Sequence, residues 1–255
     1  MSNFIRTISL IGLGGIGSWF VTPFLRFLSA EGFTGEITLA DGDKFSAENV
    51  GRQNVDHTEI GLPKVTVFTN RLALALPGLR LRTFTEYVSE ENVATVIKDG
   101  SLVVVAVDNH PARALISRHA GTLRDTCVLS AGNEKYDGNV HVYLRRAGRD
   151  MSVPLLERHP EIAKARSGDR AEMGCEQLAA AGEPQLLVTN FMAATALLVA
   201  FHAVWEKEAG ARSRRHRAPL PQEVYFDVRQ QAMSAIASIA PVTSDVSARE
   251  LIAIN

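Results

Sequence analysis

ISLIGLGGIGSW, residues 8–19, is the stretch around which this chain is organised. Its apolar beginning predicts a buried β-strand, and apolar residues then recur at helical spacing from Ile16 to Leu28. Between these two segments lie the four glycines Gly12, Gly14, Gly15 and Gly17. Glycines let backbone N–H groups approach a phosphate closely, and a helix N-terminus favours negative charge. The stretch therefore predicts a strand, a glycine-rich turn and a helix that bind a nucleotide.

Composition limits the class of protein. The 255 residues are 46% hydrophobic and 22% charged, which is typical of a globular chain with a large core. No linker or internal repeat is visible, so a single domain over residues 1–255 is expected. The formal net charge of −1 gives no reason to expect binding to nucleic acid or to an anionic membrane. A signal peptide is not recognisable at the N-terminus, which favours a cytoplasmic location.

The remaining pattern alternates strands and helices. Strands are expected over residues 35–41, 79–88, 102–107, 126–132 and 139–146, with one or two late strands over 223–239. Helices are expected over residues 64–75, 89–100 (with Ser89 as N-cap), 153–165 and 185–208. This order predicts an α/β fold of the Rossmann type, in which helices flank a mostly parallel sheet with antiparallel late strands.

The apolar run over residues 186–205 is long enough to span a bilayer. It also contains Thr189, Asn190, Thr195 and His202, which are costly in a membrane. A helix buried against the sheet or in a subunit interface is therefore the better interpretation.

Three charged residues distinguish between nucleotides. A glycine-rich turn alone favours NAD, but an NAD site does not need the two cations Arg52 and Lys64 after the second strand. Asp108 follows the apolar strand over 102–107, where the carboxyl ends of parallel strands face the ligand crevice. A carboxylate there suits Mg²⁺. Two cations, a metal ligand and the glycine-rich turn indicate a triphosphate site.

Four sequence blocks, in this order and spacing, resemble the ThiF/MoeB/ubiquitin-activating superfamily. They are GLGGIGS (12–18), DGDKFSAENVGRQN (41–54), GLPK (61–64) and VDNHPAR (107–113). The resemblance implies a ThiF/MoeB-type adenylation fold, with ATP and Mg²⁺ as ligands. It also implies ATP-dependent adenylation of the C-terminal glycine carboxylate of a ubiquitin-like protein, in a homodimer.

The resemblance also assigns residues. Asp41 corresponds to the acceptor of the ribose hydroxyls, and Arg52 and Lys64 correspond to the phosphate-binding cations. Asp108 corresponds to the magnesium-associated aspartate, and the resemblance makes Arg52 and Asp108 candidate catalytic residues. The nucleotide-binding set is completed by Gly12, Gly14, Gly15, Gly17, Asp43, Asn49 and Gln53.

The two cysteines differ in context. Cys127 lies in an apolar strand and is expected in the core, whereas Cys175 lies in a polar loop near residues 166–184, before the long helix. Enzymes of this superfamily often pass the activated carboxyl group to a cysteine, which makes Cys175 the candidate for a thioester and for transfer to a conjugating (E2-like) enzyme. A loop cysteine without a role is the alternative.

The chain departs from the superfamily in two respects. It lacks the two C-x-x-C pairs of a zinc site, and Arg6 is the one nearby candidate for an arginine that reaches a neighbouring subunit. Other functions therefore stay open: activation of a sulfur carrier, cyclisation of threonylcarbamoyladenosine in tRNA, or a non-catalytic binding subunit.

Overall fold

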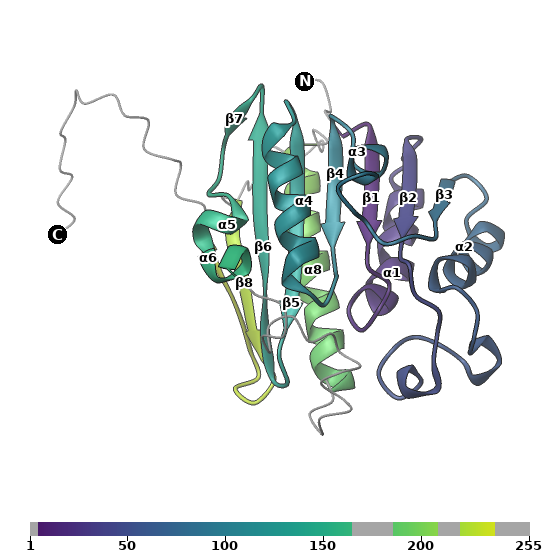
Figure 1. The fold of residues 1–255 in the computed structure, drawn as a ribbon. Coiled ribbons are helices and arrows are strands. Elements are labelled where there is room, and N and C mark those ends of the chain that lie inside the picture. Colours follow the sequence, from purple (N-terminus) through teal and green to yellow (C-terminus); the bar gives the residue numbers. More distant parts are fainter. Residues whose placement is uncertain (1–4, 165–185, 209–219, 238–255) are drawn as a thin grey trace, which may run out of the picture.

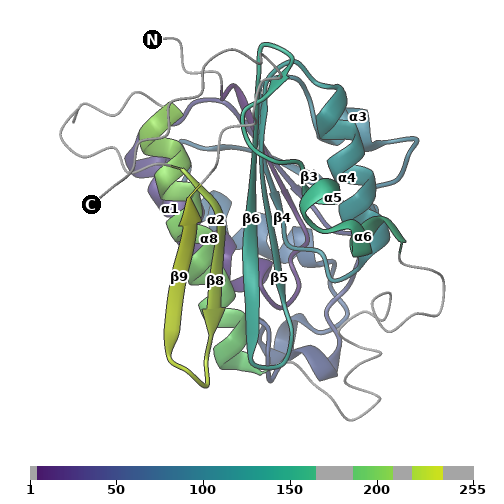
Figure 2. The same cartoon turned by 90° about the vertical axis from the view of Figure 1, so that its left-hand side faces the viewer.

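The computed structural model describes residues 5–164, 186–208 and 220–237, and the described strands form one nine-stranded sheet (Figure 1). Its strand order is β3-β2-β1-β4-β5-β6-β8-β9, and β7 pairs with β6. Helices cover both faces of this sheet (Figure 2). The expected Rossmann-like architecture, mostly parallel with late antiparallel strands, is therefore confirmed.

The first half of the sheet is parallel. Its strands are β1 (Thr7–Ile11), β2 (Glu36–Ala40), β3 (Arg80–Phe84), β4 (Ser101–Val105) and β5 (Thr126–Asn133). Every residue of β4 is buried, as its continuous apolar sequence predicts for a central parallel strand. From β1 the chain continues to one side through β2 and β3 and to the other through β4 and β5. The point between β1 and β4 is where such sheets bind ligands.

The second half of the sheet is antiparallel. It consists of β6 (Asp137–Arg146), β7 (Arg149–Asp150), β8 (Pro221–Asp227) and β9 (Ala232–Ala237). The late segment thus contains two strands. On β6, Val140, Val142 and Leu144 belong to the main core, while His141 and Tyr143 point to the opposite face.

Two layers of helices enclose the sheet. One contains α1 (Gly17–Ala30), α2 (Lys64–Ala75) and α8 (Leu187–Glu208), and the other contains α3 (Val93–Val96), α4 (His110–Thr122), α5 (Leu155–Arg158) and α6 (Pro160–Lys164) (Figure 2). Two short 3₁₀ helices, Ala47–Asn49 and His57–Glu59, interrupt the long loop after β2. That loop lies beside the carboxyl ends of β1 and β2.

The apolar helix α8 packs against α1 through an aromatic cluster. The Phe201 ring lies edge-on to Phe24 with centroids 4.7 Å apart. Of the described helices, α8 alone has the length and composition of a membrane span, but half of the residues in its apolar window are buried in the protein. Its buried Thr189 and Asn190 form hydrogen bonds with loops of the same chain, which accounts for polar residues in an apolar helix.

Several predicted boundaries shift for identifiable reasons. The helix over 64–75 is confirmed, but the helix expected over 153–165 is two short helices, because Pro160 disfavours helical backbone at His159 and starts α6. The helix expected over 89–100 is the single turn α3, whose N-cap is Asn92 and not Ser89. The strand expected over 79–88 ends at Phe84.

Cys127 is fully buried as predicted, and Cys175 lies outside the described residues.

Candidate active site

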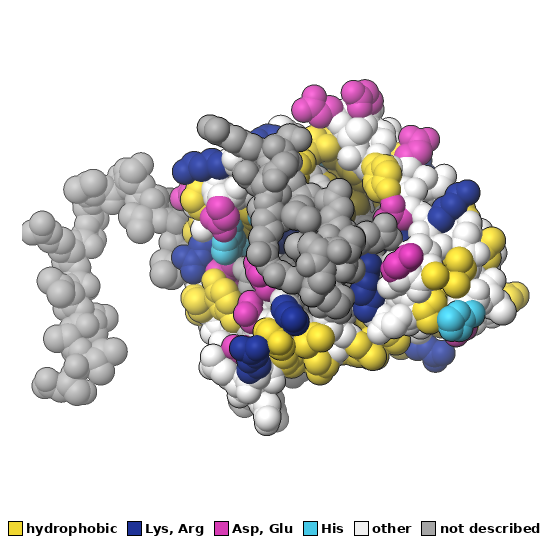
Figure 3. All heavy atoms as spheres, turned by 60° about the horizontal axis from the view of Figure 1, so that its bottom comes forward, with side chains coloured by type: hydrophobic (Ala, Val, Ile, Leu, Met, Phe, Trp, Pro, Cys, Tyr) yellow, Lys and Arg dark blue, Asp and Glu magenta, His cyan; other side chains and the backbone are white. Residues whose placement is uncertain are grey.

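A cavity of about 1030 Å³ lies at the carboxyl ends of the parallel strands. Figure 3 views the molecule from this end, where acidic and basic side chains lie side by side. The cavity is lined by most of the predicted site residues: Gly12, Gly14, Gly15, Asp41, Asp43, Arg52, Gln53, Lys64 and Asp108. The fold therefore brings residues from four separate sequence blocks to one place.

The glycine-rich turn is close-packed. Gly12 has a φ of +94°, and a Cβ there would lie 2.6 Å from the Ala106 carbonyl oxygen. A Cβ on Gly17 would lie 1.9 Å from the Gly12 carbonyl oxygen, so the start of α1 can approach the turn only with glycine at this position. Gly17 packs the helix and does not line the cavity, whereas Gly14 and Gly15 do. The local pattern in the sequence therefore combines two requirements, packing and ligand approach.

Asp41 joins the glycine-rich turn to the end of β2. Its carboxylate accepts hydrogen bonds from the backbone N–H groups of Leu13 (2.5 Å) and Asp43 (2.8 Å). Burial raises the pKa of Asp41, and the nearby Lys64 ammonium opposes that shift. Besides its predicted role toward ribose, Asp41 therefore fixes the shape of the turn.

Arg52 is a buried cation without a hydrogen-bonded counterpart. The residue is 4% exposed, and its Nε, Nη1 and Nη2 atoms have no hydrogen-bond partner among the described residues. Its backbone, in contrast, is held firmly, because its carbonyl oxygen accepts bonds from Trp19 Nε1 and Asn190 Nδ2, each at 3.1 Å. The fold thus positions a guanidinium group at the cavity wall, where an anion would complete its hydrogen bonds.

Two neighbours of Arg52 have different roles. Asn49 is fully buried, its Oδ1 accepts the Ser46 backbone N–H at 3.0 Å, and it is not among the lining residues. Its carbonyl oxygen accepts the backbone N–H groups of Arg52 (3.0 Å) and Gln53 (2.8 Å). Gln53 lines the cavity, and its Oε1 has no hydrogen-bond partner in the described part of the chain. Asn49 therefore shapes the loop that presents Arg52 and Gln53.

Lys64 begins α2 and is buried, although a lysine at a helix start is usually exposed. Its Nζ lies 3.0 Å from Asp43 Oδ2. Asp43 also accepts a hydrogen bond from the Tyr87 hydroxyl. Burial raises the pKa of Asp43, but the bonds from Tyr87 and Lys64 outweigh it and leave that pKa below its usual value. The result is an ionised carboxylate that holds Lys64 at the cavity.

Three helix N-termini meet the cavity. The turn before α1, the first residue of α2 and the first turn of α4 all line it. The N-terminus of α4 is ordered by Asn109, whose Oδ1 accepts the Ala112 backbone N–H at 2.9 Å. Asp108, just before this cap, is an exposed carboxylate at the cavity. Helix N-termini and cations favour a polyphosphate, and a carboxylate beside them can hold a divalent cation.

Sequence reasoning missed Tyr87, Arg113 and Arg118 as cavity residues. Tyr87 lies beyond the end of β3, in a segment whose alternation resembles a longer strand. Arg113 lies in a block that matches the superfamily pattern, and it donates to the Val107 carbonyl oxygen at 2.8 Å. The sequence could have indicated Arg113 as a cavity residue, because it lies five residues after Asp108 in the helix that starts at the cavity.

The sequence profile of the ThiF family matches residues 5–253 of the chain. A sulfur carrier protein adenylyltransferase of Thermus thermophilus is 31% identical over 138 residues, 54% of this chain and 49% of that protein. A tRNA threonylcarbamoyladenosine dehydratase of Haemophilus influenzae is 26% identical over 172 residues, 67% of this chain and 62% of that protein. The chain thus spans 49% and 62% of the lengths of these two relatives.

A crystal structure of E. coli MccB with ATP has a similar fold. The TM-score is 0.65 at 16% sequence identity, and the match covers 94% of this chain and 66% of MccB. At this identity, the likeness establishes the fold alone.

Proposed function

The chain belongs to the ThiF family, and we propose that it uses ATP to adenylate the C-terminal glycine carboxylate of a ubiquitin-like protein. The observation that carries this proposal is the Arg52 guanidinium, buried at the cavity wall and without a hydrogen-bond partner among the described residues. A buried charge whose hydrogen bonds are not satisfied is strongly destabilising, so the presence of Arg52 favours an anionic ligand at this place. Relatives that act as adenylyltransferases, and MccB crystallised with ATP, support the same nucleotide.

The cavity fits a triphosphate better than a dinucleotide. Arg52 can donate two parallel hydrogen bonds to phosphate oxygens, while Lys64 is a compact charge held in place by Asp43. The glycine-rich turn and the N-terminus of α4 supply backbone N–H groups on the other sides. Asp108 would hold Mg²⁺, which prefers oxygen ligands and, when bound, neutralises charge between phosphate groups.

The chemistry needs no general base. The substrate carboxylate is already ionised at pH 7, and its oxygen attacks the α-phosphorus of ATP. A new P–O bond forms to give the acyl-adenylate, and the bond to the bridging oxygen breaks to release pyrophosphate. Arg52 and Lys64 stabilise the charge that develops on pyrophosphate, and the rigid turn keeps the α-phosphate in line with the attacking oxygen.

A thioester on Cys175 forms the second half of the proposal. The Cys175 thiolate would attack the acyl-adenylate carbonyl carbon, AMP would leave, and the acyl group would pass to a conjugating enzyme. Cys175 lies outside the described residues, so this step depends on the superfamily resemblance. A homodimeric, cytoplasmic protein of one domain, with no nucleic-acid or membrane partner, belongs to the same proposal.

Activation of a sulfur carrier is the second candidate. The Thermus thermophilus relative is named for this activity, and both candidates share the adenylation step. They differ in the fate of the acyl group, because sulfur transfer produces a thiocarboxylate and conjugation produces a thioester. The Haemophilus influenzae relative adds tRNA as a substrate to be tested.

Pyrophosphate exchange into ATP tests the shared step. The protein would be incubated with ATP, Mg²⁺, labelled pyrophosphate and a small protein that ends in glycine, or with tRNA in a parallel reaction. We expect exchange that requires the terminal glycine carboxylate and is lost in Asp108→Ala. Exchange with tRNA alone, or with no substrate at all, would overturn the proposed substrate. A reducible adduct that persists in Cys127→Ala and disappears in Cys175→Ala would identify the thioester.

A further inference from the structure

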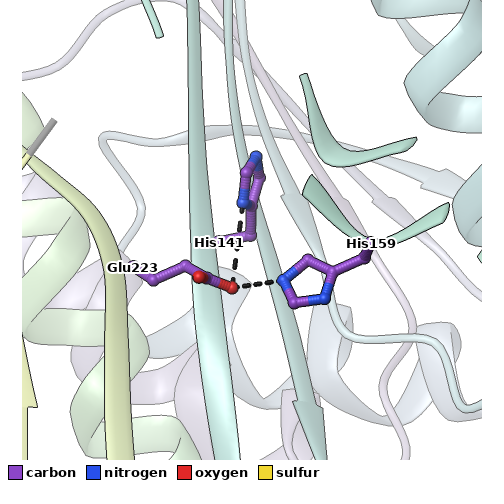
Figure 4. Close-up of side chains that lie close together, drawn as sticks. All are labelled: His141, His159 and Glu223. Carbon is purple, nitrogen blue, oxygen red and sulfur yellow. Dashed lines mark hydrogen bonds and ion pairs between the residues drawn. The ribbon is translucent and has the colours of Figure 1, made fainter. Parts of the chain in front are cut away.

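A second cluster of polar side chains lies on the sheet face that is covered by α5 and α6. His141 comes from β6, Glu223 from β8 and His159 from the turn between α5 and α6 (Figure 4). His141 and Glu223 are direct partners in the antiparallel pairing of β6 with β8. Each residue offers one ligand atom, and these three atoms lie within 4.8 Å of one another.

His141 offers an unused lone pair. Its Nε2 lies 3.0 Å from the Val153 carbonyl oxygen, which must accept a proton from it, so in the neutral ring Nδ1 is unprotonated. Nδ1 has no hydrogen-bond partner among the described residues and lies 4.0 Å from Glu223 Oε1. Two acceptors thus face each other, an arrangement that a cation between them would stabilise.

His159 is oriented for the same point. Its Nδ1 lies 3.0 Å from a Glu161 carboxylate oxygen, while its Nε2 contacts Glu223 Oε1. Histidines that bind metals commonly donate their other N–H group to a carboxylate or a backbone carbonyl, which fixes the ring orientation. His159 has the carboxylate form of this support, and His141 has the carbonyl form.

Glu223 presents one oxygen to the histidines. Its side chain is fully buried, and Oε2 accepts bonds from Arg158 Nε at 3.0 Å and from the Tyr225 hydroxyl. Oε1 accepts a bond from Asn139 Nδ2 at 2.9 Å and faces both imidazole rings. The carboxylate is therefore ionised and suited to bind through a single oxygen.

We propose that His141 Nδ1, His159 Nε2 and Glu223 Oε1 bind a divalent transition-metal ion, for which Zn²⁺ is the best chemical match. The neutral imidazole of His141, the imidazole of His159 after release of its Nε2 proton to solvent, and one carboxylate form a known zinc ligand set, with water in the fourth position. Ligand distances of about 2.0–2.1 Å place the ligand atoms of a tetrahedral ion roughly 3.3 Å apart. The Nδ1 atom of His141 would therefore approach Glu223 Oε1 by less than about 1 Å, and the Nε2 atom of His159 would move away from Glu223 Oε1. The His159 side chain is 19% exposed, so this ligand is in contact with solvent.

The ion would join three parts of the fold. Its ligands come from β6, from β8 and from the turn between α5 and α6, so binding would fix residues 155–164 against the sheet. Ile162 and Ala163 of α6 line the large cavity. The proposed site therefore supports a wall of the cavity from outside it, and it stands independently of the proposed function.

Zinc titration of the full-length protein tests this site. After chelator treatment, the protein would be titrated with Zn²⁺ against a chromophoric competitor in excess Mg²⁺, which occupies sites made only of oxygens. We expect one Zn²⁺ per chain, at least 100-fold weaker binding in His159→Gln, and about tenfold weaker binding in Glu161→Gln, which replaces the carboxylate beside His159 with a neutral amide. Cobalt substitution should give the visible absorption of a tetrahedral ion, and this absorption should be absent from His159→Gln.

Three control variants separate this site from others. His202→Gln removes an exposed histidine of α8, Glu157→Gln removes an exposed acid of α5, and Cys175→Ser removes the Cys175 thiol. Each should bind Zn²⁺ within twofold of the unaltered protein. Circular dichroism would confirm that His159→Gln is folded, and Glu161→Gln alters a mainly exposed side chain and provides an independent measurement. The proposal would be overturned if the protein bound no Zn²⁺ tightly, or if His159→Gln and Glu161→Gln bound Zn²⁺ with the affinity of the unaltered protein. Either result would show that the cluster is a hydrogen-bonded network only.

Discussion

Arg52 and Glu223 are both buried charges, and they differ in how the fold treats them. Glu223, with a fully buried side chain, accepts hydrogen bonds from four side chains: Asn139, Arg158, His159 and Tyr225. Arg52 is 4% exposed, and none of its three guanidinium nitrogens has a hydrogen-bond partner in the described part of the protein. A charge paired within the chain contributes to the folded state, whereas a buried charge without such a partner indicates where a ligand of opposite sign binds.

The largest expected effect is that of replacing Arg52, the buried charge without a hydrogen-bond partner among the described residues. Arg52→Met should reduce the rate of pyrophosphate exchange by about 10³-fold, because a positioned cation that stabilises developing charge contributes on this scale. Arg71→Met is the matched control, since Arg71 lies near the same loop but is paired with Glu59 and Asp56. The exchange rate of Arg71→Met should stay within a few-fold of the unaltered protein. A loss of similar size in both variants would indicate general damage to the loop.

Removing the other charge should affect folding instead. Glu223→Gln leaves Arg158 and His159 without their anion. Because Arg158 is 42% exposed, we expect a loss of about 3 kcal/mol of unfolding free energy, the lower end for a broken buried ion pair. Urea denaturation in the presence of a chelator measures this loss without any contribution from metal. ATP affinity of the folded fraction should be unchanged, because Glu223 does not line the cavity. If the unfolding free energy of Glu223→Gln lay within about 1 kcal/mol of that of the unaltered protein, the hydrogen bonds of Glu223 would contribute little to stability.

Backbone packing around the cavity predicts an intermediate effect. Gly17→Ala places a methyl group against the Gly12 carbonyl oxygen, and such overpacking costs about 1–3 kcal/mol. It should also weaken ATP binding, because the turn that contains Gly14 and Gly15 would shift. Gly51→Ala, where a Cβ meets no atom within 4 Å, should leave thermal stability and ATP affinity nearly unchanged. Equal behaviour of the two variants would contradict the packing account of the turn.

The smallest effect concerns Asp43, which holds Lys64. Since the folded protein has a lowered Asp43 pKa, this carboxylate contributes stability above its unfolded pKa of about 3.9, and the contribution is lost as pH falls through the folded value. Tyr87→Phe removes one of the bonds that lower the pKa of folded Asp43, so the contribution should be smaller and its loss should be complete at a higher pH. Because Asp43 is 42% exposed, the change should stay below about 1 kcal/mol. If the unfolding free energy of Tyr87→Phe followed the same dependence on acid pH as that of the unaltered protein, the Tyr87 bond would not contribute to the lowered pKa of Asp43.

Local patterns explain which features could be predicted. The turn at Gly12–Gly17 and the start of α2 at Lys64 depend on neighbouring residues, and the structure has them where the sequence indicates. The cations Arg52 and Lys64 were expected at the nucleotide, although either residue, considered without the other motifs, would be expected at the protein surface. Their burial follows from contacts with α1, α8 and Asp43, which are distant in sequence.

The cluster around Glu223 could not be predicted for a different reason. His141 and Glu223 meet through the pairing of β6 with β8, and no local pattern specifies that register. His159 arrives there because Pro160 divides one expected helix into two. Asn49 shows the converse difference: it matches a nucleotide-site motif, yet its buried side chain accepts the backbone N–H of Ser46 and holds the loop.

ATP affinity, measured together with thermal stability, tests the central claim most directly. Isothermal titration of the unaltered protein, Arg52→Met and Arg71→Met with ATP and Mg²⁺ would be combined with melting curves of the ligand-free proteins. Arg52→Met removes a buried charge that has no hydrogen-bond partner in the described part of the chain, so its melting temperature should be unchanged or raised while its ATP affinity falls at least 100-fold. Arg71→Met should show the reverse, with ATP affinity retained and the melting temperature lowered. Equal ATP affinity in Arg52→Met and the unaltered protein would contradict the assignment of Arg52 to the bound phosphates.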